Sequence, residues 1–133
     1  MKRLRVVVLT LLIASTFTCG DSTTPMPAAL ITGPGWLPLQ LETSATDAGG
    51  VLVTIRGGAV DSVRSAVHDV FSKRVGPLMK VAIIGDLTAG VIAEIFVPDT
   101  ERASNYSASV DQAAGRTLEQ RDVADYEVKV GGL

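Results

Sequence analysis

The stretch from residue 79 to residue 98, MKVAIIGDLTAGVIAEIFVP, constrains the fold more than any other part of the chain. It predicts two buried β-strands, at residues 80–84 and 90–97, that pair as a hairpin across a short polar loop at residues 85–90. Both segments are apolar on nearly both faces, whereas an edge strand alternates cleanly between apolar and polar side chains. The sequence therefore places this pair in the middle of a domain, with Ile83 and Ile95 almost fully buried.

The remaining strands are predicted from the period of two that a half-buried strand shows. Residues 60–75 are ambiguous, because their apolar side chains fit either a helical stripe or two strands, and their β-branched content favours two strands. Residues 98–104 form a polar connection with room for one helical turn begun by Asp99. The prediction is an all-β, antiparallel sandwich of about eight or nine strands. These lie at residues 37–42, 51–56, 61–66, 69–75, 80–84, 90–97, 105–113, 118–121 and 125–130.

The first eighteen residues predict a signal peptide. A basic start at residues 1–5 is followed by an apolar run at residues 6–13 and then by small and hydroxylic residues. This order is typical of secretory leaders. The apolar run is well short of the ~20 residues that span a bilayer. The alternative is a hydrophobic first strand of a cytosolic protein.

Cys19 is the only cysteine of the chain, so an intramolecular disulfide is excluded. With the preceding leader and the Ser-, Thr- and Pro-containing segment after it, Cys19 resembles the lipidation site of bacterial lipoproteins. The resemblance covers about residues 1–27 and implies that Cys19 carries a diacylglyceryl group and anchors the protein to membrane lipid. Because Gly20 follows the cysteine, it also implies the outer membrane or cell surface rather than the inner membrane. Secretion without a lipid is the alternative.

Residues 19–36 predict a flexible tether, because they are rich in Pro, Gly, Ser and Thr. The single domain then comprises residues 37–133. Trp36, the only tryptophan, is expected to pack where the tether meets the domain, and an exposed sugar-stacking ring is the alternative. Three of the twelve basic residues belong to the leader, which leaves nine against fourteen acidic residues, a net charge of −5. That balance argues against nucleic acid as a partner.

The sequence offers little catalytic chemistry. His68 is the only histidine, and Ser65 and Asp69 are near it only in sequence. A nucleophilic triad needs all three groups in contact, and the chain has neither a nucleophile elbow nor a second histidine to complete a metal site. We therefore expect no enzymatic activity, no catalytic residue, no metal and no cofactor.

The carboxylates at two places in the chain each allow more than one interpretation of their role. Asp122, Asp125 and Glu127 could supply oxygen ligands to Ca²⁺, but solvated loop charges explain them equally well. Glu94 lies inside an otherwise apolar strand. It either faces water on the outside of a sheet or pairs with a cation on a neighbouring strand.

Three runs, at residues 85–97, 106–110 and 126–130, resemble the second half of bacterial cohesin-like modules. Those modules are jelly-roll sandwiches related to carbohydrate-binding modules, although many Ig-like sandwiches share the spacing. The similarity covers about residues 50–131. It implies a non-catalytic domain that binds an envelope protein or a polysaccharide. The alternatives are a structural envelope lipoprotein with no ligand of its own and a small envelope enzyme.

Binding residues are expected in the loops, because loops on a rigid sandwich carry specificity. The loops concerned are residues 47–50, 85–90 and 98–104. The candidate binding residues in them are Asp47, Gly49, Asp86, Thr88, Asp99 and Glu101.

Overall fold

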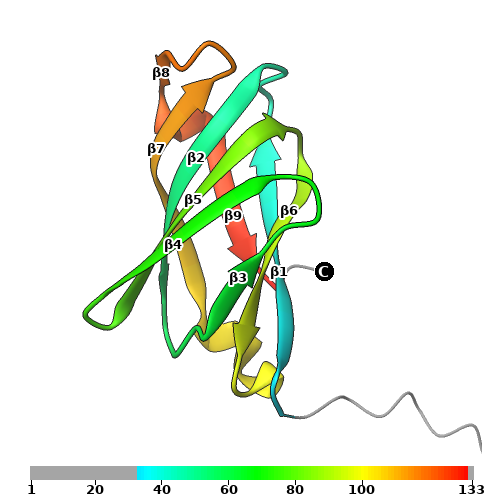
Figure 1. Ribbon diagram of the computed structural model, residues 1–133, viewed down its shortest axis with the longest axis vertical. Helices are drawn as coiled ribbons and strands as arrows, with labels where there is room; N and C mark the ends of the chain where they lie inside the picture. The colour runs from blue at the N-terminus through cyan, green and yellow to red at the C-terminus, as the bar shows by residue number, and fades with distance from the viewer. Residues whose placement is uncertain (1–32, 132–133) are drawn as a thin grey trace, which may run out of the picture.

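The computed structural model describes residues 33–131, which form two antiparallel sheets packed face to face (Figure 1). One sheet has the strand order β3-β6-β1-β9 and the other the order β4-β5-β2-β7-β8. The predicted all-β sandwich is therefore confirmed. The strands are β1 (Gly35–Thr43), β2 (Ala48–Arg56), β3 (Ser62–Arg64), β4 (Asp69–Val75), β5 (Leu78–Leu87), β6 (Gly90–Val97), β7 (Ser107–Gly115), β8 (Gln120–Arg121) and β9 (Tyr126–Val130). Two short 3₁₀ helices, η1 (Thr100–Asn105) and η2 (Val123–Asp125), complete the described elements.

Several local predictions are confirmed. The ambiguous segment at residues 60–75 forms two strands, β3 and β4, and β6 has the predicted bounds. Asp99 begins the helical turn η1, since its side chain accepts a hydrogen bond from the Glu101 N–H at 3.0 Å. An Asp at this position satisfies one of the amide groups that the start of a helix leaves without a partner.

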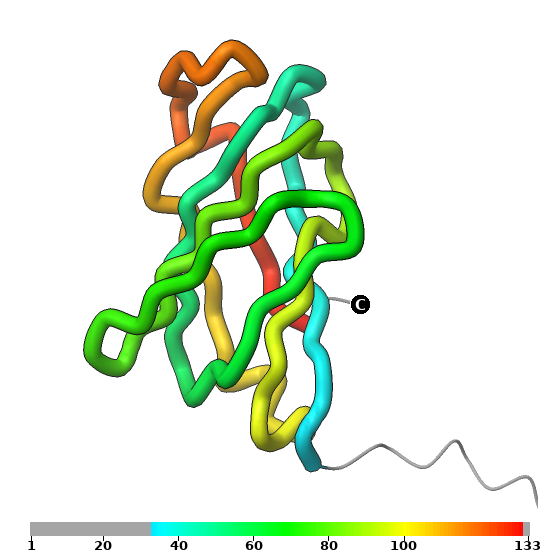
Figure 2. The backbone as a smooth tube through the Cα atoms, in the orientation of Figure 1, coloured from blue at the N-terminus to red at the C-terminus, as the bar shows by residue number. Residues whose placement is uncertain are grey.

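The predicted pairing of the two apolar strands is wrong. Strand β5 lies between β4 and β2, whereas β6 lies between β3 and β1 in the opposite sheet. Only Thr88 and Ala89 connect them, so the chain crosses from one sheet to the other (Figure 2). Each strand has neighbours on both sides, as predicted for a central strand. Its outer face is nevertheless open to solvent, since Ile84 of β5 is 43% exposed and Val91 of β6 is 55% exposed.

Strand β5 continues past its predicted end at residue 84. Gly85 has a φ of +154°, and the register between β2 and β5 shifts at this point. Beyond the shift Leu87 stays on the inward face with Ile83, where it is fully buried and pairs with Ala48. Because β5 extends to Leu87 and β6 begins at Gly90, the predicted loop at residues 85–90 is mostly strand.

Strands β1 and β2 also begin earlier than predicted. Strand β1 starts at Gly35, which makes Trp36 part of the sheet, and β2 starts at Ala48. Gly49 was expected in a turn but lies in β2, where a Cβ atom would come within 2.4 Å of the Gly115 carbonyl oxygen. Only glycine allows this close approach between β2 and β7.

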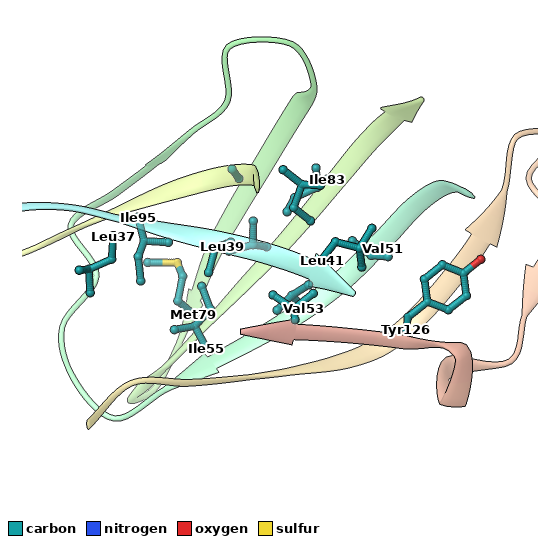
Figure 3. Packing of buried hydrophobic residues seen from close by; sticks show 14 of the residues in the cluster. Leu37, Leu39, Leu41, Val51, Val53, Ile55, Met79, Ile83, Ile95 and Tyr126 are labelled. Atoms are coloured by element: carbon teal, nitrogen blue, oxygen red, sulfur yellow. The ribbon is translucent and has the colours of Figure 1, made fainter. Parts of the chain in front are cut away.

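The core fills the space between the two sheets (Figure 3). Ile83 of β5 and Ile95 of β6 are both 0% exposed, as predicted. They pack with alternate residues of β1 and β2, because a strand directs every second side chain to the same face. Those residues are Leu37, Leu39, Leu41, Val51, Val53 and Ile55.

A bulge in β7 changes the predicted face of its second half. Leu52 pairs with Gln112 and Val53 with Val110, so Asp111 is the extra residue. As a result Ala113 faces the core, and Gln112, which an unbroken period of two would place on the same face as Val110, is exposed instead. The bulge inverts the alternation from this residue onward.

Candidate functional site

A shallow hollow of about 300 Å³ lies on the outer face of the five-stranded sheet. Its floor is Gly50, which lies between Ile84 of β5 and Ala114 of β7 in the ladder. A Cβ atom at Gly50 would meet only ordinary contacts, the nearest at 3.6 Å. The hollow therefore exists because glycine occupies this position, although packing would allow a side chain. The other lining residues that face outward are Leu52, Ala82, Gln112, Leu118 and Gln120.

Leu118 stands at the rim of this hollow in an unusual conformation. It has a φ of +66° and is the only non-glycine residue between 33 and 131 with a positive φ. The left-handed region costs an L-residue roughly 1–2 kcal/mol, and Leu118 recovers none of it by burial, because it is 76% exposed. Folding gives no reason for a large apolar side chain here. A strained, exposed residue of this type is a signal of function.

Ion pairs fix the turn that carries Leu118. Arg116 pairs with Asp86 of β5 and donates to the Thr46 carbonyl oxygen at 3.3 Å. Arg121 pairs with Asp47 and, at 2.5 Å, with Glu119. The connection between β7 and β8 is thereby attached to the ends of β2 and β5. The charges surrounding the hollow are consequently compensated within the chain.

The pKa of Glu119 is lowered to about 2, first by the Thr117 hydroxyl hydrogen bond and also by a backbone hydrogen bond and Arg121. A depressed carboxyl pKa contributes order that is complete above the ordinary value of 4.5 and is lost as the pH falls toward 2. We expect the β7–β8 turn to loosen in that window while the core stays intact. The measurement is an NMR titration that follows the Glu119 carboxyl carbon and the Gly115 amide, which donates to the Glu119 carbonyl oxygen at 2.9 Å.

Glu119→Gln is the control for this titration, because it removes the carboxylate and should abolish the acid transition of the Gly115 amide. A Gly115 amide signal that stays constant from pH 5 to pH 2 in the unmodified protein would contradict the role assigned to Glu119.

The structure divides the predicted binding residues between the two ends of the sandwich. Asp47, Asp86 and Thr88 lie at the end with the hollow, and Gly49 is one of the residues that line the hollow. The carboxylates of Asp47 and Asp86 are already paired with arginines. Asp99 and Glu101 lie at the opposite end, with η1 (Figure 1). At that end the Thr100 N–H donates to the Gly33 carbonyl oxygen at 2.9 Å. The six residues therefore do not form one site.

The Ser65 hydroxyl holds a turn. It donates to the Ile92 carbonyl oxygen at 2.8 Å and accepts from the His68 backbone N–H at 3.2 Å. The His68 ring packs on Gly85, where a Cβ atom would come within 2.7 Å of its Nδ1. Nδ1 is buried and has no hydrogen-bond partner among the described residues. This arrangement does not pair the imidazole with a hydroxyl that it could deprotonate.

Trp36 belongs to a stacked group on the outer face of the four-stranded sheet. Its ring meets Phe96 edge-on, with centroids 5.2 Å apart, and the Arg64 guanidinium lies 3.8 Å above it. Arg64 also pairs with Glu94 at 2.8 Å. Trp36 thus packs, as expected, but on a sheet face. Both readings of Glu94 hold, because its side chain lies partly exposed on the outer face of the sheet and pairs with a cation on a neighbouring strand.

Asp122, one of the acidic residues near the C-terminal end, has a local role. The Asp122 side chain caps η2 by accepting from the Ala124 N–H at 3.0 Å. Between residues 33 and 131 no group of three or more His, Cys, Asp or Glu side chains is arranged to hold a metal ion. Nor does any helix in this range combine the length and hydropathy needed to cross a bilayer.

No family model, curated protein or solved structure matches the chain. The candidate site therefore rests on the geometry of the hollow and of Leu118. The hollow was not predicted, because Gly50 was expected to lie in a turn. A signal was present: Gly49 and Gly50 lead directly into a run of alternating apolar residues, and an isolated leucine, Leu118, interrupts a polar turn.

Proposed function

We propose that the protein is a non-catalytic, lipid-anchored binding module of the bacterial cell envelope. Its binding site is the hollow over Gly50, and its ligand is a protein that inserts an uncharged apolar side chain beside Leu118. The observation that carries the proposal is Leu118 itself, a strained and exposed leucine at the rim of an uncharged hollow.

The chemistry of the hollow favours a protein over a polysaccharide. Leu52, Ala82 and Ile84 give it aliphatic walls, and none of its described lining residues is charged. The centre of a protein interface is likewise depleted of charge, and a few large side chains dominate its energy. A sugar ring needs an open aromatic face to stack on, and no described residue that lines the hollow is aromatic. The face of Trp36, on the other sheet, is occupied by Arg64.

The position of the hollow suits display from a membrane. The first described residue, Gly33, lies beside η1, at the end of the sandwich opposite the β7–β8 turn (Figure 1). A tether from a lipidated Cys19 would join the domain at that end and leave the hollow facing outward. The resemblance to cohesin-like docking modules supports the binding role. The engagement of the Ser65 hydroxyl in a turn supports the non-catalytic part of the proposal.

Filling the hollow should abolish binding without harming the fold. Gly50→Val places a side chain where the nearest atoms allow it, and β-branched residues suit strands better than glycine does. We expect stability to rise by up to about 1 kcal/mol. Leu118→Gly relieves the positive φ and should leave stability unchanged or slightly higher. Both variants should lose the partner, measured by photo-crosslinking in intact envelopes and by thermal melting.

The crosslinking experiment places a photoreactive phenylalanine analogue at residue 118, with residue 67 as the matched control. Val67 is 79% exposed but lies between β3 and β4, away from the hollow. A specific protein adduct at residue 118, absent at residue 67 and removed by Gly50→Val, is expected. Equal adducts at both positions, or binding that persists in Gly50→Val, would contradict the proposal.

A further inference from the structure

Strand β4 is an open edge of the five-stranded sheet. It pairs with β5 along all seven of its residues, and no strand between residues 33 and 131 lies on its other side. Every second residue of such an edge directs its N–H and C=O groups outward, where another strand can pair with them. Phe71, at the third position of β4, is 62% exposed on the outer face. The edge thus combines open backbone groups with an apolar side chain.

The charges on β4 are arranged symmetrically about Phe71. Asp69 lies two residues before it and Lys73 two residues after it, so all three share the outer face. Within residues 33–131 neither Asp69 nor Lys73 forms an ion pair.

Lys73 also lies directly opposite another lysine. Its ladder partner is Lys80 of β5, and like charges in this position destabilise a sheet. The Lys80 ammonium has a counterion, Asp111, at 2.6 Å, and also donates to the Thr54 hydroxyl at 2.5 Å. Lys73 has no such counterion among the described residues, so a carboxylate from a second chain would relieve the repulsion.

We propose that two copies of the protein associate through β4, antiparallel to each other, across a twofold axis at Phe71. This register places Asp69 of each copy opposite Lys73 of the other and brings the two Phe71 rings together. The ion pairs supply the missing counterion of Lys73, and the interface is isologous, as a closed dimer requires. The two five-stranded sheets become one continuous sheet.

The charges select this register over its neighbours. An axis at Ser72 would place Phe71 opposite Lys73 and leave Asp69 opposite Val75. An axis at Val70 would place Phe71 opposite Asp69 of the other copy. Only the axis at Phe71 pairs both charges with opposite ones, and register is what cross-strand side chains specify.

The dimer is independent of the proposed binding function, because it requires no partner. It would, however, place the two hollows on the same face of the joined sheet and give the assembly two tethers. Two linked sites bind a repeated or clustered ligand more tightly than one site does.

Sedimentation velocity of the full chain carrying Cys19→Ser tests the proposal. We expect a monomer–dimer equilibrium that Asp69→Lys and Lys73→Asp each weaken by about tenfold or more, because each single change turns two attractive pairs into two repulsive ones. The double variant Asp69→Lys/Lys73→Asp restores the pairs in reverse and should recover the affinity. Gly50→Val should leave the dimer unchanged, which separates this result from the binding function.

Disulfide trapping gives a second readout in the same Cys19→Ser background. Phe71→Cys should form an interchain disulfide under mild oxidation, because the two residues meet at the axis. Val91→Cys, at an exposed position of β6 in the other sheet, should not. A chain that stays monomeric at about 0.5 mM, far above a micromolar dissociation constant, would overturn the proposal. So would a dimer that ignores both charge reversals, or a double variant as weak as the single ones.

Discussion

Ile95→Asp is expected to prevent the domain from folding. Ile95 is 0% exposed and lies in the middle of β6, between Leu37 of β1 and Val63 of β3. Aspartate there would place a carboxylate among apolar side chains without a hydrogen-bond donor. The expected loss exceeds about 4 kcal/mol, which is most of the stability of a domain of this size. Circular dichroism and NMR at 25 °C should show an unfolded chain.

Two matched variants control for this result. Ile95→Val removes one methylene group and should cost about 1 kcal/mol while leaving the domain folded. Val91→Asp introduces the same carboxylate into the same strand, but at an exposed position, where the change should stay within about 0.5 kcal/mol. If Ile95→Asp melted at the wild-type temperature, the inward face of β6 would have to be reassigned.

The strands themselves were largely predictable from sequence, because the alternation of side chains is a local property. Strand β6 is apolar apart from Glu94 and keeps its predicted bounds. The identity of its neighbours is not local. The short polar loop at residues 85–90 suggested a hairpin, yet the register shift beside Gly85 and the positive φ of Gly90 accompany a crossing to the other sheet. A pattern of side chains within one strand contains no information about which strand pairs with it.

The candidate site was less predictable than the fold. The hollow depends on Gly50 of β2 lying between Ile84 of β5 and Ala114 of β7. These three strands are far apart in the sequence. The conformation of Leu118 is likewise invisible in the sequence, since leucine gives no signal for a positive φ. Acidic loop residues were the obvious candidates, but in the folded chain the carboxylates of Asp47 and Asp86 are paired with arginines.

Cys19→Ser is expected to release the protein from the membrane. The leader and Cys19 lie outside the described residues, so this prediction rests on the resemblance to lipoproteins. Each buried methylene of an acyl chain contributes about 0.8 kcal/mol, and two chains suffice for stable anchoring. Serine offers no thiol for the diacylglyceryl group. In fractionated cells the protein should move from the detergent phase to the soluble extracytoplasmic fraction.

The matched control is Ser22→Ala, which changes a hydroxyl in the same segment without touching the thiol and should leave the protein in the membrane. The released Cys19→Ser protein should melt at the wild-type temperature, because the nearest described residue, Gly33, lies fourteen positions further along the chain. Mass spectrometry of the wild-type amino terminus gives the direct check, since a lipidated cysteine is heavier by its acyl chains. A wild-type protein already soluble after export would show that Cys19 is not an anchor, and the hollow would then act in solution.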